Sequence, residues 1–171
     1  MPPLLIAAIV VFLEVVCLGA IIPTLPRFTT TLGGSELIAG VMFALVSAPK
    51  IFMNPLWGRL SDRSGRRSVM ILLTVGTMGG SVLWAMTPKL GAMVGAPLVV
   101  LAGSRLIYGI FSAQATLAFA IASDRSTPEK RTAALGMLGA AFGAGLTVGF
   151  PVGGFVAHQF DYAAVGWLCA G

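Results

Sequence analysis

The chain has 171 residues, of which 57% are hydrophobic and only 10% are charged. Soluble globular domains carry about a quarter charged residues, so this composition excludes a water-soluble domain and indicates an integral membrane protein. The net charge of +5 lies mostly in short connections between apolar runs. There it orients a membrane chain, and it does not indicate nucleic-acid binding. Glycine is frequent, which favours close helix packing in lipid.

Five apolar runs of about 20 residues or more each have the length that a helix needs to cross the membrane. They predict spanning helices over residues 4–22, 36–57, 68–87, 97–123 and 132–157. A sixth run begins near Tyr162 and stops at Gly171, too short to span. Pro23 and Pro26 are expected to end the first helix, because proline removes a backbone donor. The predicted fold class is therefore all-α, a polytopic membrane bundle with five complete helices and the start of a sixth.

The basic residues set the orientation through the positive-inside rule. A basic connection between the second and third helices is expected in the cytoplasm, which also places the N-terminus there. Met1 is followed by Pro2 without a basic segment, so a cleaved signal peptide is not expected. On this threading the cytoplasmic side holds Arg59, Arg63, Arg66, Arg67, Arg125, Lys130 and Arg131, the outside holds Arg27 and Lys89, and Lys50 and Arg105 remain within the membrane.

One connection carries a dense motif, Gly58-x-Leu60-Ser61-Asp62-Arg63-x-Gly65-Arg66-Arg67. Asp62 and Arg66 are four residues apart and are expected to pair across one turn at the start of the third helix, where Asp62 also suits the helix dipole. Gly58 and Gly65 are expected to allow tight backbone turns. Thr127 reads as a helix N-cap with Pro128 at the first helical position, and Ser126 with Glu129 offers an overlapping capping box.

These residues, in this position, resemble the signature loop of the major facilitator superfamily. Three further stretches agree: Arg105-x-x-x-Gly109 resembles the arginine motif of the fourth helix, Asp124 with Glu129-x-Arg131 resembles the second cytoplasmic loop, and Gly145-x-x-x-Gly149-Phe150-Pro151-x-Gly153-Gly154 resembles the antiporter motif of drug/proton exchangers. Phe150 stands where that motif usually has proline. Glu14 is similar in placement to the first-helix acid of tetracycline/proton antiporters.

The resemblance implies about twelve helices in two halves, so residues 1–171 correspond to most of an N-terminal transmembrane half. It implies that the 58–67 motif latches the cytoplasmic gate through a charge network with Asp124 and Arg131, although orientation of the chain alone could also explain its charge. It implies a proton-coupled transporter of drugs or metabolites, in the inner membrane of a bacterium. The partners are then a small-molecule substrate, protons, lipid, and a missing C-terminal half or another membrane chain.

Three residues within the membrane are candidates for coupling. Glu14 lies roughly 15 Å deep at 1.5 Å per residue, where a carboxylate is costly and functional by default; a structural ion pair is the alternative. Arg105 lies level with it, so we expect the two to approach each other directly or through water, for coupling or to fix helix register. Lys50 could line a cavity or extend toward the membrane surface.

The glycines of the fifth helix have two readings, since the spacing of Gly145, Gly149 and Gly153 suits close helix packing as well as an antiport role. Cys17 and Cys169 lie in apolar runs and read as small hydrophobes. His158 reads as a solvated side chain. We expect no enzyme activity, cofactor or metal, because no nucleophile–base pair, phosphate loop or ligand spacing is visible. The alternative function is a non-transporting membrane subunit or scaffold.

Overall fold

The protein is described by a computed structural model that covers residues 3–171. This part of the chain forms eight helical segments and contains no strand: α1 (Pro3–Thr31), α2 (Glu36–Ser64), α3 (Arg66–Ala85), α4 (Thr87–Val94), α5 (Pro97–Phe111), α6 (Gln114–Arg125), α7 (Pro128–Gln159) and α8 (Tyr162–Ala170). Five of these stretches are long and apolar enough to cross a membrane, with α5 and α6 together making one of them. The predicted all-α bundle with five spans and the start of a sixth is confirmed.

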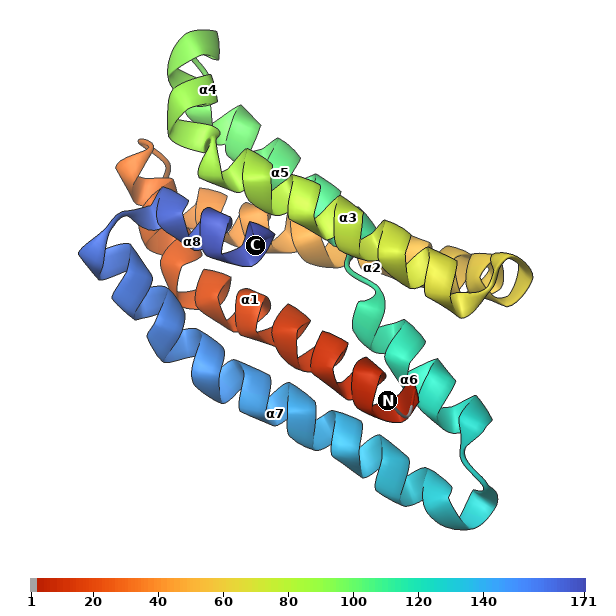
Figure 1. Cartoon of the computed structure of the whole chain (residues 1–171). Helices are drawn as coiled ribbons and strands as arrows, with labels where there is room; N and C mark the ends of the chain where they lie inside the picture. Colours follow the sequence, from red (N-terminus) through yellow and green to blue (C-terminus); the bar gives the residue numbers. More distant parts are fainter. Residues whose placement is uncertain (1–2) are drawn as a thin grey trace.

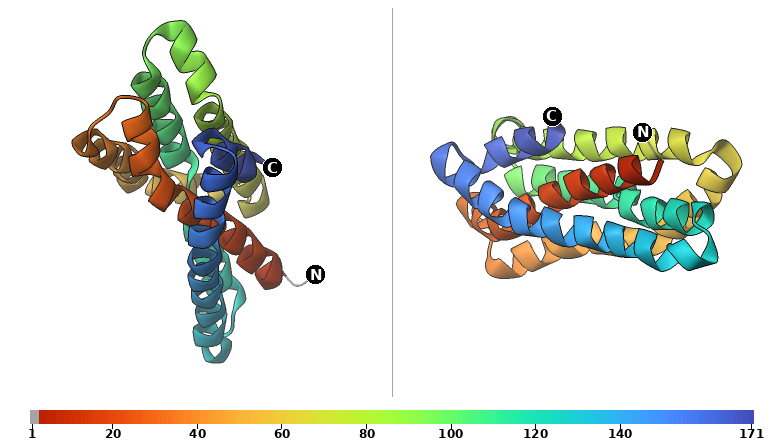
Figure 2. Two further views of the ribbon diagram at one scale, coloured as in Figure 1. Left: turned by 90° about the vertical axis from the view of Figure 1, so that its left-hand side faces the viewer. Right: turned by 60° about the horizontal axis from the view of Figure 1, so that its bottom comes forward.

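The long helices run side by side in an elongated bundle in which α1 is central (Figures 1 and 2). On one side α1 packs along α7 and α6, and on the other side it contacts α2 and α8. The short helix α8 lies between α1 and α3. Many large apolar side chains remain exposed, among them Leu13, Ile51 and Phe52. Such exposure suits a protein whose outer surface meets lipid, because lipid does not penalise apolar groups as water does.

The first helix is longer than the sequence analysis predicts, since α1 continues through Pro23 and Pro26 to Thr31. The predicted stop at Pro23 is therefore wrong. Packing stabilises the helix beyond Pro23, because Leu25 and Phe28 are almost fully buried against residues of α2, α3, α5 and α8. In the same stretch the hydroxyl of Thr24 donates to backbone carbonyls one turn earlier, at 3.0 Å. Prolines are tolerated in membrane helices where such packing and hydroxyl groups stabilise the local backbone.

The second helix also runs further than predicted and includes most of the 58–67 motif, because α2 ends at Ser64. Pro49 and Pro55 lie inside it, as expected. Gly58 is helical, so the tight turn predicted at that residue is wrong. The whole reversal is made at Gly65, whose φ of +88° lies in the region that glycine adopts without strain. Because α3 begins directly afterwards at Arg66, the connection between the two spans is a single residue.

Two differences concern the outer loop and the last span. The expected external loop at residues 88–96 is largely helical, since α4 follows α3 after Met86. The last complete span begins earlier than predicted, at Pro128, with Thr127 as its N-cap residue. The predicted cap at Thr127 with proline at the first position is thus confirmed, although the Thr127 side chain makes no capping hydrogen bond and Ser126 precedes the cap.

The seam between α1 and α7 depends on glycine. Gly145, Gly149 and Gly153 are all buried on the face of α7 that meets α1. A Cβ atom added at Gly153 would lie 2.2 Å from the carbonyl oxygen of Ala20, and one added at Gly149 would lie 2.5 Å from that of Val16. No side chain larger than hydrogen fits these gaps, so the predicted close backbone approach along this stripe is confirmed. A Cβ atom added at Gly154, by contrast, would meet no atom of another element within 4 Å.

The seam makes a direct prediction about the glycines of α7. Gly153→Ala should cost about 1–3 kcal/mol of stability, because the added methyl group overpacks the contact with α1. Gly154→Ala is the matched control in the adjacent position, and it should be neutral or slightly stabilising. Thermal unfolding of the purified variants in detergent measures the difference. Equal stability of the two variants would contradict a tight seam.

Candidate functional site

The candidate site lies at a break in the helix of the fourth span. Helix α5 ends at Phe111 and α6 starts at Gln114, with Ser112 and Ala113 between them. Ser112 has φ −84° and ψ 68°, and the Ala113 N–H donates to the Phe111 carbonyl at 3.0 Å. This geometry matches an inverse γ-turn. The break creates a new helix N-terminus inside the membrane, whose first N–H groups have no partner within the helix.

Glu14 of α1 supplies the acceptor for this helix end. The backbone N–H of Ala115, in the first turn of α6, donates to Glu14 Oε2 at 3.0 Å. The hydroxyl of Ser112 donates to Glu14 Oε1 at 3.3 Å. A carboxylate at a helix N-terminus also meets the positive end of the helix dipole. The acid is therefore bound by the ends of a discontinuous span, an arrangement that suits ion and substrate sites in membranes.

Helix α6 also carries a second polar side chain at the break. Gln114 is buried, and its Nε2 donates to Thr77 Oγ1 of α3 at 3.0 Å. Its Oε1 is buried and has no hydrogen-bond partner among the described residues. A buried acceptor without a partner is costly, so this oxygen is available to a water or a ligand donor.

Lys50 belongs to the same region. It is half-buried on α2 and close enough to Glu14 for the two charges to interact electrostatically. Of the two readings of Lys50, this proximity favours the one that turns it toward the interior. Five residues from four spans thus form what we call the polar cluster: Glu14, Lys50, Thr77, Ser112 and Gln114.

Arg105 does not form the direct ion pair with Glu14 that the sequence suggests. Its Nε donates to Ser104 Oγ at 3.3 Å, and its guanidinium carbon lies 4.3 Å from the centroid of the Trp84 ring. Tyr108 provides a second aromatic face at 5.4 Å. Arg105 is 1% exposed and is directed toward α3, which is why the helix end at Ala115 holds Glu14 instead. A contact through water stays a prediction.

Ser112, Gln114 and Thr77 are the site residues that the sequence analysis missed. The only feature of the sequence that could have found them is that they are polar residues within apolar runs. Ser112 and Gln114 are also separated by a single residue. No glycine or proline marks the break at residues 112–113, so the span reads as one continuous helix.

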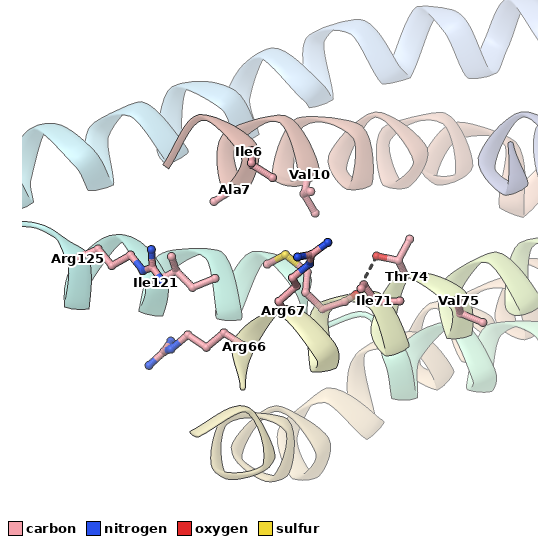
Figure 3. A pocket seen from close by; sticks show the side chains of 11 residues that line it. Ile6, Ala7, Val10, Arg66, Arg67, Ile71, Thr74, Val75, Ile121 and Arg125 are labelled. Carbon is pink, nitrogen blue, oxygen red and sulfur yellow. Dashed lines mark hydrogen bonds between the residues drawn. The ribbon is translucent and has the colours of Figure 1, made fainter. Parts of the chain in front are cut away.

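Two adjoining cavities open beside α1, and both are lined by Val10 and Thr74. One, of about 360 Å³, includes Glu14, Gln114 and Thr77 in its wall together with Cys17 and Cys169. The other is a groove of about 700 Å³ between α1, α3 and α6. In Figure 3 its apolar side chains face one another across the groove, Arg66 and Arg125 lie at one end, and Arg67 reaches into its middle toward Val10.

The 58–67 motif joins two parts of the bundle through Arg66. Its guanidinium pairs with Asp62 at 3.2 Å and also with Asp124 at the end of α6. The predicted pair of Asp62 and Arg66 is confirmed, but Asp62 lies in the last turn of α2 and not at the start of α3. Arg131 donates to Ser123 rather than to a carboxylate. Within residues 3–171 neither Arg63 nor the groove residue Arg67 forms an ion pair.

Several apolar spans with a discontinuous helix and an acid at the break define a polytopic integral membrane protein built like a transporter. Comparison with known proteins agrees: a sequence model described as Major Facilitator Superfamily matches residues 5–171. The chain belongs to this family. Because the family consists of transporters, the expectation that the chain is not an enzyme is confirmed.

The similar proteins include several resistance proteins. The tetracycline resistance protein class E of Escherichia coli is 36% identical over 155 residues, which cover 88% of this chain and 36% of that protein. A multi-drug resistance efflux pump PmrA homolog of Lactococcus lactis subsp. lactis (strain IL1403) is 32% identical over 150 residues, covering 85% of this chain and 35% of the relative. The chain therefore spans only about a third of the length of the relatives that it matches.

The helix break predicts the effect of removing one donor. Ala115→Pro deletes the N–H that binds Glu14 while keeping a residue tolerated in the first turn of a helix. A hydrogen bond to a charged group is worth about 1.5–3 kcal/mol, so stability should fall by that amount. Thr116→Pro is the control in the same turn, because no bond joins residue 116 to Glu14. Equal losses in thermal unfolding would show that the Ala115 contact is not important.

The Arg66 cluster predicts a small, salt-sensitive effect. Asp124→Asn removes one carboxylate from Arg66, and since both acids are more than half exposed, the loss should not exceed about 1 kcal/mol. It should shrink in high salt, which screens exposed charges. Thermal unfolding at two salt concentrations measures it, with Glu36→Gln as an exposed control. A large loss that persists in salt would contradict the solvent-screened pair.

Proposed function

We propose that the chain is the N-terminal half of a proton-coupled transporter that exports a small molecule, a drug or a metabolite. The observation that carries the proposal is the carboxylate of Glu14 bound at the N-terminus of α6 in the interior of the bundle. The names of the relatives, tetracycline resistance proteins and a multi-drug efflux pump, support drugs as the substrate class. We place the protein in the inner membrane of a bacterium, with the N-terminus in the cytoplasm, from the distribution of basic residues.

Glu14 would act by exchanging its proton during the change of access. Hydrogen bonds from Ala115 and Ser112 and the charge of Lys50 stabilise the ionised carboxylate, whereas apolar surroundings favour its neutral form. A rearrangement of α5 against α6 alters this balance, because the donors to Glu14 lie at their junction. Proton loading and the state of the fourth span are thereby linked. Arg105 lies on the same span beside Tyr108 and packs against Trp84 of α3, so it would transmit that change to α3.

The cytoplasmic gate would be held by the 58–67 motif. Arg66 ties the end of α2 to the end of α6 through Asp62 and Asp124, so this contact can stabilise one state of two halves that rock against each other. Arg63, Arg67 and Arg131 add positive charge at the same end. Gly65 keeps the connection short, whereas Gly58 lies inside α2.

The outer surface of α7 suits the partner half. The seam with α1 buries three glycines of the antiporter motif, Gly145, Gly149 and Gly153. Pro151 and Gly154 of the same motif are exposed on the other side of the helix. Phe150 is exposed beside them. We expect these residues to contact the C-terminal half. The groove of about 700 Å³ between α1, α3 and α6 adjoins the cavity that the end of α8 lines, and it could receive a further helix.

The second candidate function is a non-transporting subunit or scaffold that pairs with another membrane protein. The mass of the purified species and cross-linking to partners separate the two functions. A complex with an unrelated membrane protein and without substrate transport favours the scaffold.

The decisive variant is Glu14→Gln, which keeps the shape of the side chain but removes its ionisation. In the full-length transporter it should abolish proton-driven transport and leave folding intact. Substrate uptake into inverted vesicles under an imposed pH gradient measures the effect, and Glu36→Gln at the exposed start of α2 is the control. Unchanged transport in Glu14→Gln would remove Glu14 from the mechanism.

A further inference from the structure

Two thiols from distant parts of the sequence meet beside the polar cluster. Cys17 of α1 and Cys169 of α8 are the only cysteines among the 171 residues. The thiol of Cys169 donates to the carbonyl oxygen of Cys17, with 3.7 Å between sulfur and oxygen. Both cysteines line the cavity of about 360 Å³, so a small ion can reach them from one side.

A positive charge without a counterion lies next to this pair. Arg105 is 1% exposed and its Nη2 has no hydrogen-bond partner among residues 3–171. Its guanidinium carbon lies 4.3 Å from the centroid of the Trp84 ring, and Cys169 packs against the apolar cluster that contains Trp84. No carboxylate pairs with it in the described part of the chain. Burial of an unpaired charge is costly, and the aromatic faces of Trp84 and Tyr108 offset only part of that cost.

We propose that Cys17 and Cys169 form a two-coordinate binding site for a soft monovalent cation such as Cu(I) or Ag(I). Thiolate ligands select soft ions. The described residues contain no group of three or more histidine, cysteine or acidic side chains able to hold a metal. A two-sulfur site therefore suits an ion that accepts two ligands better than zinc, which takes four.

The charge of the complex explains the role of Arg105. When the cation binds, the two thiols release two protons to the surrounding water, and each sulfur forms one bond to the metal. Two thiolates and one monovalent cation carry a net charge of −1. Arg105 contributes +1 and neutralises that charge, while the Glu14 carboxylate in the same cavity wall is offset by the charge of Lys50. A divalent soft ion such as Hg(II) already gives a neutral complex with two thiolates and would not need the arginine.

The first experiment measures silver binding to the full chain purified in detergent. Silver nitrate is titrated in chloride-free buffer, with stoichiometry from native mass spectrometry and affinity from calorimetry. We expect one tightly bound ion per chain. Because two linked ligands act together, Cys17→Ser and Cys169→Ser should each weaken binding by about 100-fold. Unchanged affinity in either variant, or two equally tight ions per chain, would overturn the site.

The second experiment compares silver with mercury in variants of Arg105. Arg105→Gln should weaken silver binding by about 10-fold, because a buried anion loses its counterion, and should leave mercuric ion binding nearly unchanged. Arg105→Lys, which keeps the charge, should retain silver binding. One mercuric ion per chain in Arg105→Gln shows that the thiol pair is intact. If Arg105→Gln weakened the binding of silver and of mercuric ion equally, while Arg105→Lys bound both as the wild type does, the charge argument would be contradicted. Since binding is measured directly, the proposal does not depend on the proposed transport.

Discussion

The contact between the Glu14 carboxylate and the start of α6 is the interaction on which the rest of the arrangement depends. Within a membrane every backbone N–H needs a partner, because lipid offers none. The break at residues 112–113 leaves such groups free, and Glu14 accepts from one of them and from Ser112. The same bonds satisfy a carboxylate that would otherwise be isolated in an apolar interior. Each group therefore requires the other, which fixes α1 against the junction of α5 and α6.

The other contacts of α1 hold that junction in place. On one side the glycine seam brings α7 within backbone distance of α1. The apolar residues Val11 and Val15, one turn or less from Glu14, are buried in a cluster shared with α6 and α7. At one end of the bundle Arg66 connects α2 and α3 to the last turn of α6. A movement of α6 thus affects the acid in the interior of the bundle and the charge cluster at its end together, which is the coupling that the proposed alternating access would require.

Local patterns in the sequence were sufficient for much of this account. Apolar run lengths gave the five spans, the four-residue spacing of Asp62 and Arg66 gave their ion pair, and the repeat of Gly145, Gly149 and Gly153 gave the seam. The failures involve contacts that depend on packing. Pro23 does not end α1 because the following residues are buried against four other helices. Depth in the membrane alone pairs Glu14 with Arg105, whereas its actual partners lie at a helix break that contains no glycine or proline.

Nuclear magnetic resonance of the Ala115 amide, labelled with nitrogen-15 in the membrane-embedded protein, tests the central contact most directly. The amide proton donates to Glu14 Oε2, and its chemical shift reports the charge on that oxygen. We predict that the Ala115 signal titrates with pH in the wild-type protein and becomes insensitive to pH in Glu14→Gln. A signal that is the same in both proteins at every pH would show that Glu14 is not bound at the start of α6, and would contradict the account.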